Sequence, residues 1–276
     1  MAEISAKDIA ALRKQTGAGM LDCRTALQET GGDIEAAKDW LRTKGLAGAA
    51  KRAGREAQDG AVEVTVEGSV GAIVELNCET DFVAKGAEFR ALVAALTKIV
   101  AEQGDDDLES RAYEGGTVGD AVKQLGATLG ENVGIGRVAR IESADGIVDG
   151  YKHVQNERGT IGVLVELGGI NPSDGRAQEV AHDVALHIAS AAPQYVTRDD
   201  VPADVLEKER AVLEELTRNE GKPEQAIPKI VEGRLGGFFK KEVLLEQEFV
   251  KDPKQTITQL LGPANVTRFA RVAIGE

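Results

Sequence analysis

The chain has 276 residues, of which 42% are hydrophobic and 29% charged, and this is the composition of an ordinary globular protein large enough for more than one domain. It has no run of 18 apolar residues and no apolar segment typical of a secretory signal, which excludes a membrane span and predicts a cytoplasmic protein. The net charge is −13, with +1 on residues 1–60 and −14 on the remaining residues, so direct binding to nucleic acid is not expected of the main body.

The first 45 residues predict three short helices joined by glycine turns. Ser5 and Asp8 form a capping-box pattern at the start of the first helix. The second helix is expected to begin near Met20, and Asp33 is expected to cap the third, which should end at Gly45. A three-helix module of this size usually binds a partner rather than catalysing a reaction.

Residues 46–103 predict a linker, a β-hairpin and a long helix. Residues 46–60 are rich in Ala, Gly and charge and indicate a partly helical linker. The basic run 51–55 could touch RNA, although a solvated linker is the favoured interpretation. Alternating residues predict a hairpin of strands 61–68 and 69–76, and residues 87–103 carry the broad apolar face of a helix.

The stretch ELNCETDFVAK, residues 75–85, is unusual because an acidic turn between the strand and the helix ends in an aromatic residue. Three interpretations compete: a catalytic Cys-Glu-Asp cluster, a metal site, or a loop that inserts into a partner. Glu79 and Asp81 flank Cys78 and should raise its pKa, which disfavours the thiolate that a cysteine nucleophile needs.

The rest of the sequence gives little support to the first two interpretations. The chain has three histidines, and two of them, His182 and His187, are predicted on different faces of one helix. Four zinc ligands are not brought together, and the phosphate-loop and nucleophile-elbow patterns are absent. The run GIGRVA, 134–139, imitates a dinucleotide fingerprint but precedes β-type sequence. No enzyme activity, metal or cofactor is therefore expected.

A repeat with a shift of 91 residues isolates the aromatic tip of the unusual stretch. Residues 71–76 align with 162–167, and residues 88–96 align with 179–187, so a strand and a helix recur at constant spacing. The tip Thr80–Phe82 has no counterpart in the second copy. A lone Phe normally folds back into its own core, but this difference favours a function added to one copy.

The last quarter of the chain, from about residue 205, predicts an antiparallel helical hairpin followed by a short helix and a strand. The first helix of the hairpin shows a narrow apolar seam at Val205, Glu209, Val212 and Leu216. A turn at 218–225 leads into a returning stripe, which comprises Ile227, Ile230, Val231 and Leu235.

Five stretches resemble bacterial elongation factor Ts, in the order in which that family has them. ELNCETDFVAK (75–85) and LRKQTGAGMLDCRTAL (12–27) are similar to the two signature stretches of the family, and GENV (130–133), YKH (151–153) and KIVEGRL (229–235) agree as well. The chain has Arg24 where the family usually has Lys, and it ends soon after its last strand, so contacts made by a longer C-terminal module are not expected.

The resemblance and the patterns together predict an α+β fold. It comprises an N-terminal three-helix, ubiquitin-associated-like module, two duplicated α/β subdomains with antiparallel sheets, and an antiparallel helical hairpin that forms a coiled coil. The expected boundaries are 1–54 for the module with its linker, 55–140 for the first core subdomain, 141–204 with 248–276 for the second, and 205–247 for the hairpin.

The resemblance also implies a function, namely non-enzymatic guanine nucleotide exchange on elongation factor Tu in its GDP-bound and nucleotide-free forms. Thr80, Asp81, Phe82 and Val83 would enter near the magnesium site of that partner, and no nucleotide would bind to this chain itself. Possible further contacts are Leu12, Arg13, Gly19, Met20 and His153, although core packing is the favoured role of Leu12. A translation-linked binding protein or chaperone adaptor is the alternative.

Overall fold

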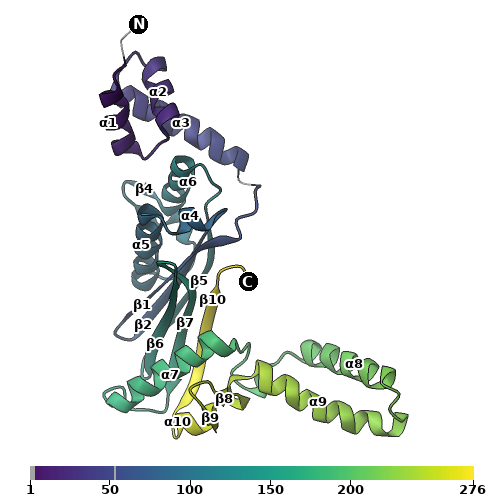
Figure 1. Cartoon of the computed structure of the whole chain (residues 1–276). Coiled ribbons are helices and arrows are strands. Elements are labelled where there is room, and N and C mark those ends of the chain that lie inside the picture. Colours follow the sequence, from purple (N-terminus) through teal and green to yellow (C-terminus); the bar gives the residue numbers. More distant parts are fainter. Residues whose placement is uncertain (1–3, 53) are drawn as a thin grey trace.

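The computed structural model describes residues 4–52 and 54–276, and for residues 46–51 it describes the backbone alone. Residues 1–3 of the predicted module and part of the basic run 51–55 therefore lie outside the described residues. Figure 1 shows the N-terminal helices at one end of an elongated body of two sheets, with a helical hairpin projecting from the other end. No helix in the described ranges is long and apolar enough to cross a bilayer.

The N-terminal module has the three predicted helices, α1 (Ala6–Thr16), α2 (Met20–Glu29) and α3 (Ile34–Arg52). The predicted caps are confirmed, because the Ser5 hydroxyl accepts the Asp8 N–H at 3.1 Å and the Asp33 carboxylate accepts the Ala36 N–H at 3.0 Å. The small core consists of the buried residues Leu12, Cys23, Ala26, Leu27 and Ala37.

The predicted end of α3 at Gly45 is wrong, because the helix continues to Arg52. A Cβ atom at Gly45 would lie 2.8 Å from the Ala127 Cβ of helix α6 (Val118–Leu129), closer than real contacts allow. The guanidinium of Arg52 then donates to the Gly126 carbonyl at 3.3 Å. This glycine therefore permits close helix packing and does not terminate the helix, and the module is joined to the body through packed helices.

The body contains two three-stranded antiparallel sheets. In the first sheet the order is β1 (Asp59–Glu67), β2 (Val70–Cys78) and β5 (Gly134–Glu142). In the second the order is β10 (Asn265–Ala273), β7 (Arg158–Gly168) and β6 (Ile147–Gln155). The predicted hairpin and the predicted last strand are thus confirmed, as is the β-type structure predicted for RVARIE, residues 137–142, at the end of β5.

The two sheets pack face to face and each has a helix on its outer side. Val62, Ile73 and Leu164 lie in the layer between the sheets. Because side chains alternate along a strand, the neighbouring residues point outward, toward α5 (Ala87–Gln103) on the first sheet and α7 (Gly175–Ala191) on the second. The order of layers is helix, sheet, sheet, helix.

Each sheet contains a glutamate–arginine ion pair, and the two glutamates occupy positions related by the 91-residue repeat. Glu75 on β2 pairs with Arg137 on β5 at 2.8 Å, and Glu166 on β7 pairs with Arg268 on β10 at 2.7 Å. In both sheets the strand that carries the arginine has one extra residue opposite the glutamate. Both glutamates are buried, and the parallel favours duplication, which remains a prediction.

The projecting hairpin consists of α8 (Ala203–Asn219) and α9 (Ile227–Glu242). The predicted seam on α8 is confirmed at Val205, which packs against the core of the hairpin, but it is wrong at Val212 and Leu216, which are 59% and 48% exposed. The residues of α8 that face α9 are Leu206 and Leu213, and Thr217 is fully buried beside them. The returning stripe on α9 is buried as predicted at Ile227, Val231 and Leu235.

The remaining elements are short. Helix α10 (Ile257–Leu261) is the predicted short helix, and four small strands were not predicted: β3 (Ala112–Tyr113), β4 (Gly116–Thr117), β8 (Glu248–Phe249) and β9 (Asp252–Thr256). Helix α4 (Asp81–Ala84) lies within the unusual stretch. The four predicted domain boundaries remain predictions about how the chain divides.

Candidate functional site

The loop that follows β2 carries an exposed aromatic side chain on one short helical turn. Thr80 has an extended backbone and caps α4, with its hydroxyl accepting the Val83 N–H at 3.5 Å. Phe82 lies in the first turn of α4 and is 82% exposed. The general tendency of a lone Phe to fold back into its own core is therefore not followed here, as the contrast between the two copies favoured. An exposed aromatic ring is unfavourable in water, and burying it against a partner would be favourable. Phe82 is therefore a candidate for a contact with a partner.

Asp81 is held by an ion pair within the same turn. Its carboxylate lies 2.5 Å from the Lys85 Nζ atom, four residues later, and that Nζ atom lies 5.8 Å from the centre of the Phe82 ring. The hydrogen bond from Lys85 is the main reason that the pKa of Asp81 lies below its ordinary value. The loop thus presents an ionised carboxylate beside an exposed ring.

Replacing Lys85 by methionine is expected to raise the pKa of Asp81 toward its ordinary value. Because the pKa of Asp81 is depressed in the folded state, the ion pair contributes to the stability of the fold at pH values above the unfolded-state pKa. This contribution is lost as the pH falls through the folded-state pKa. A carboxyl NMR titration of Asp81 in both proteins measures this shift. An unchanged Asp81 titration would contradict the ion pair, and exposed Lys98→Met serves as the control, since it should leave the titration unaltered.

Cys78 is a packed strand-end residue and not a candidate nucleophile. Burial, with the nearby carboxylates of Glu131 and Asp59, raises the pKa of its thiol to about 12, and the thiol donates to the Thr80 carbonyl at 3.2 Å. The thiolate is therefore scarce at neutral pH.

Each of the three histidines makes a hydrogen-bond contact with another side chain. The partners are Tyr151 for His153, Asp149 for His182 and Gln247 for His187. Within the described ranges, no three His, Cys, Asp or Glu side chains are grouped to hold a metal ion.

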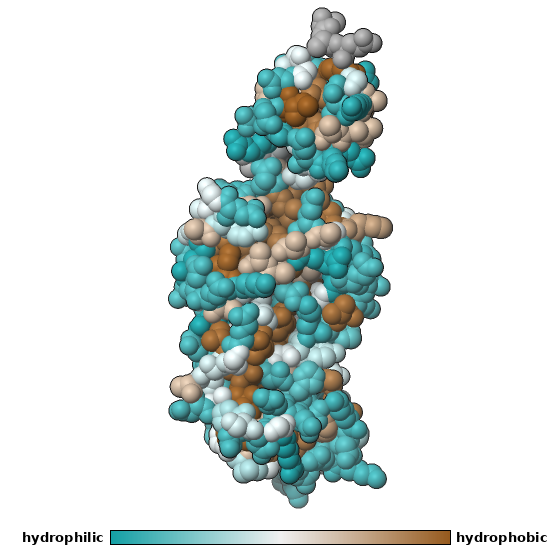
Figure 2. Space-filling model, turned by 90° about the vertical axis from the view of Figure 1, so that its left-hand side faces the viewer, coloured by the Kyte–Doolittle hydropathy of each residue, from teal (hydrophilic) through white to brown (hydrophobic). Residues whose placement is uncertain are grey.

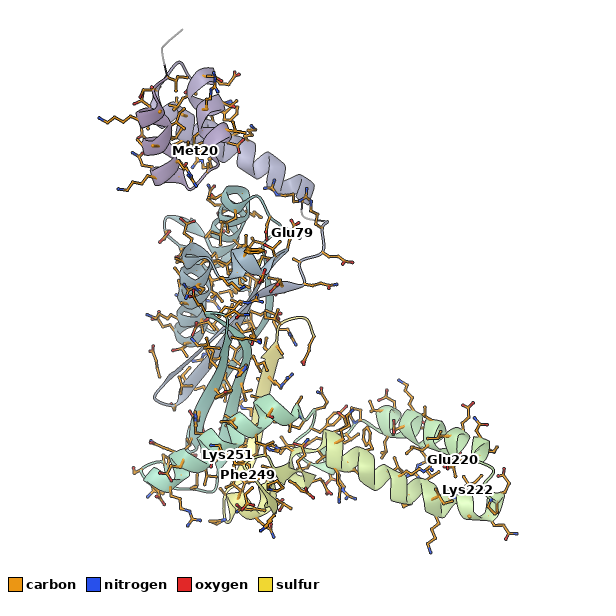
Figure 3. All side chains as sticks on the ribbon, viewed as in Figure 1. Met20, Glu79, Glu220, Lys222, Phe249 and Lys251 are labelled. Carbon is orange, nitrogen blue, oxygen red and sulfur yellow. The ribbon has the colours of Figure 1, made fainter. Side chains whose placement is uncertain are left out.

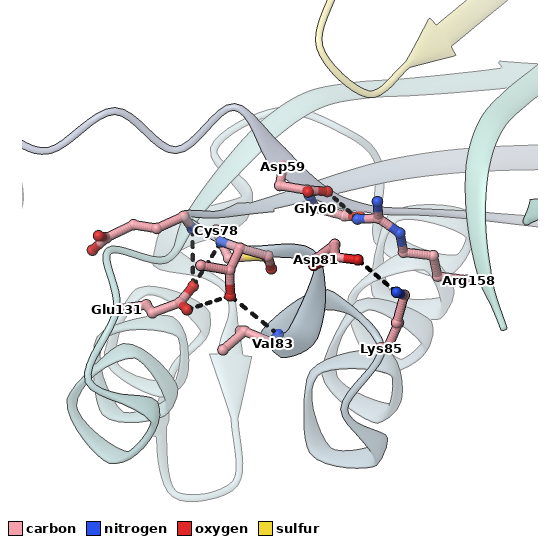
Figure 4. A network of polar contacts seen from close by, with 10 residues as sticks. Asp59, Gly60, Cys78, Asp81, Val83, Lys85, Glu131 and Arg158 are labelled. Atoms are coloured by element: carbon pink, nitrogen blue, oxygen red, sulfur yellow. Dashed lines mark hydrogen bonds and ion pairs between the residues drawn. The ribbon is translucent and has the colours of Figure 1, made fainter. Parts of the chain in front are cut away.

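Glu131 holds the base of the loop, and sequence reasoning assigned it no role. Its carboxylate accepts the backbone N–H groups of Glu79 and Thr80 at 3.0 Å each and the Thr80 hydroxyl at 2.5 Å (Figure 4). In return the Asn132 N–H donates to the Glu79 carboxylate at 2.7 Å. Glu131 and Asn132 lie in the stretch GENV, which resembles the elongation factor Ts family. The resemblance therefore pointed to these two residues, but it did not indicate that they bind the loop.

The turn between β6 and β7 lies beside this loop. Arg90 on α5 donates to the Lys85 carbonyl and to the Glu157 carbonyl, both at 3.1 Å, and so connects the two segments. His153 is exposed near this turn, and its Nδ1 atom lies 3.2 Å from the Tyr151 hydroxyl. Its neighbour Val154 is 55% exposed. Phe82 and His153 therefore lie at the same end of the body.

The candidate residues of the N-terminal module fall into two groups. Arg13, Gly19 and Met20 are exposed, and Met20 is followed by Leu21, which is 79% exposed. Leu12 is fully buried, so the structure excludes it from the module surface and assigns it to the core, as packing favoured. Figure 3 shows Met20 on the module and Glu79 at the end of the body nearest to it. Figure 2 shows hydrophobic areas on one face of both the N-terminal module and the body.

Known proteins similar to this chain share its full length. The family model described as "Elongation factor TS" matches residues 79–276. The protein named "Elongation factor Ts" from Micrococcus luteus is 49% identical over 283 residues, and proteins of that name from Streptomyces avermitilis and Thermobifida fusca are 47% and 46% identical over 285 residues. Each of these alignments covers 100% of both chains.

Proposed function

The chain belongs to the elongation factor Ts family, and from this membership we propose that it is a guanine nucleotide exchange factor for elongation factor Tu, the GTPase that delivers aminoacyl-tRNA. The observation that carries the proposal is the 82% exposure of Phe82 on a loop whose base is held by hydrogen bonds. An exposed ring on an ordered loop is suited to insertion between apolar elements of a partner, because little conformational freedom is lost on binding.

The proposed mechanism needs no covalent chemistry. In GTPases of this kind a magnesium ion bridges the nucleotide phosphates and a few protein ligands, so displacing the elements around it weakens the grip on GDP. Phe82 inserts beside these elements, and the ionised carboxylate of Asp81 competes for hydrogen-bond donors there. By linkage, bound nucleotide lowers the affinity of elongation factor Tu for the chain by the same factor as the chain lowers its affinity for nucleotide. The chain binds both the GDP complex and the nucleotide-free partner.

The N-terminal module supplies a second contact in this proposal. Arg13, Gly19 and Met20 lie exposed on it and grip the GTPase domain of the partner, while the body spans its other domains, with His153 among the contacts. The packing of Gly45 against Ala127 joins the two parts through helices. Two contacts on one partner raise the effective concentration of the second once the first has formed.

The direct test is the release of a fluorescent GDP from elongation factor Tu after rapid mixing with this protein. We expect the release rate to rise with the concentration of the factor and to saturate. An unaltered rate at saturating factor would leave only the binding-protein alternative. The assay uses both proteins at full length.

Asp81→Ala is expected to lower the maximal stimulated release rate by about tenfold, because one charge-assisted contact in the bound state is lost. The fold should be intact, since Asp81 lies on an exposed turn and is not part of a core. Circular dichroism gives the control, and Asp183→Ala on α7 gives a matched variant, since Asp183 is also a carboxylate paired with a lysine, Lys251, at 2.6 Å. Equal rates for wild type and Asp81→Ala would remove Asp81 from the mechanism.

A further inference from the structure

We propose that Glu131 is a positioning residue that sets the orientation of the loop bearing Phe82, and that it acts through Thr80. The inference rests on the proposed exchange function and adds to it a residue 51 positions away in sequence from the nearest loop residue that it binds. Glu131 itself is half-buried at the turn after α6 and does not need to touch the partner.

The contacts of Glu131 converge from one short segment. One carboxylate oxygen accepts both the Glu79 and the Thr80 N–H groups, and the other accepts the Thr80 hydroxyl proton. Hydrogen bonds to an ionised acceptor are stronger than those between neutral groups. The three bonds fix the backbone at the end of β2 and also fix the direction in which the Thr80 hydroxyl points.

The direction of that hydroxyl controls the start of α4. Because the Thr80 proton is directed at Glu131, a lone pair of the same oxygen is free to accept the Val83 N–H at 3.5 Å. Helix α4 has four residues, and a single turn is not stable without such end contacts. A chain of hydrogen bonds therefore runs from Glu131 through Thr80 to the turn that carries Phe82.

A reciprocal set of contacts makes the attachment rigid. The Glu79 carboxylate accepts the Asn132 N–H at 2.7 Å, and the Asn132 side chain donates to the Arg55 carbonyl at 2.8 Å. The Arg55 guanidinium lies 3.5 Å from the Glu79 carboxylate. The loop, the turn after α6 and the segment that leads from the N-terminal module thus meet in one polar cluster, which comprises Arg55, Glu79, Thr80, Glu131 and Asn132.

Two substitutions at Glu131 separate placement of the loop from simple loss of a side chain. Alanine removes all three acceptor contacts. Glutamine keeps an oxygen that can accept both N–H groups, and its amide can donate to the Thr80 oxygen, which is also an acceptor. Exposed Glu102→Ala on α5 is the matched control. Each full-length protein is assayed for release of fluorescent GDP from elongation factor Tu over a range of factor concentrations.

We expect Glu131→Ala to lower the maximal release rate by about tenfold to 100-fold, since misplacing a group by about 1 Å can cost on the order of 100-fold in rate, with a smaller change in the half-saturating concentration. Glu131→Gln should recover most of the rate, and Glu102→Ala should match the wild type. Hydrogen–deuterium exchange reports on the contacts independently of the partner. The amides of Glu79 and Thr80 should exchange faster in Glu131→Ala, while the amides in the middle of β2 stay protected.

Three results would overturn the inference. Unchanged protection of the Glu79 and Thr80 amides in Glu131→Ala would show that the contacts do not hold the loop. A wild-type release rate in spite of faster amide exchange would show that the loop needs no such positioning. A glutamine variant that releases GDP as slowly as the alanine variant would show that exchange depends on the negative charge of Glu131 and not on its placement of Thr80 through hydrogen bonds. Failure of the wild type to stimulate release would instead remove the proposed function, and the positioning role with it.

Discussion

Replacing Phe82 by alanine is expected to slow stimulated release of GDP by roughly 30-fold, which corresponds to a loss of about 2 kcal/mol for an aromatic residue at the centre of an interface. The side chain is 82% exposed in the free protein, so its removal deletes few contacts in the folded chain. The free energy of unfolding should therefore change by less than about 0.5 kcal/mol. Rapid-mixing release of fluorescent GDP measures the rate, and urea unfolding measures the stability.

The matched control for Phe82 is a second exposed hydrophobic residue far from the loop. Leu216 lies on the projecting hairpin and is 48% exposed, and Leu216→Ala should leave the release rate unchanged. If both variants behave like the wild type, the ring has no part in exchange. If both slow release equally, a nonspecific loss of surface hydrophobicity explains the effect.

Replacing Gly162 by valine is expected to destabilise the body by about 3 kcal/mol, the upper range for added volume in a packed layer. Gly162 lies on β7 in the layer between the two sheets. A Cβ atom there would approach the Val62, Val64 and Ile73 side chains to 2.6, 2.8 and 3.2 Å respectively. These neighbours come from the other sheet, so relief requires the sheets to separate. The shift of the urea unfolding midpoint measures the effect.

Gly233→Ala on α9 is the control for this substitution. A Cβ atom at Gly233 would meet nothing within 4 Å, and glycine within a helix is less favourable than alanine by about 0.5–1 kcal/mol. This variant should therefore be slightly more stable than the wild type. An unchanged unfolding midpoint for Gly162→Val would contradict the close packing of the two sheets.

Local sequence rules predicted most of the elements, because their causes lie within a few residues of one another. The capping box at Ser5, the hairpin of β1 and β2 and the helix at 87–103 agree with the structure. The contrast between the two copies directed attention to Thr80–Phe82, and Phe82 is indeed exposed. Its role in exchange stays a prediction until release is measured.

The errors occurred where one pattern has two physical explanations. Gly45 matched a helix stop, yet it lies inside α3 because Ala127 of another helix packs against it. Val212 and Leu216 matched a seam at helical spacing, but Leu213 faces α9 in their place. Several stripes on one helix can satisfy the same period, and only the partner helix selects among them.

The sequence alone determined the order of the elements, their caps and the unusual acidic loop with its aromatic tip, since these depend on neighbouring residues. Tertiary structure decided the approach of α3 to α6, the face of α8 that is buried and the attachment of Thr80 to Glu131, because each depends on groups distant in sequence that meet in space. The sequence around Glu131 does not identify Thr80, 51 residues earlier, as its partner. In the unfolded chain water solvates the carboxylate, and only folding brings the N–H and hydroxyl donors of the loop to it.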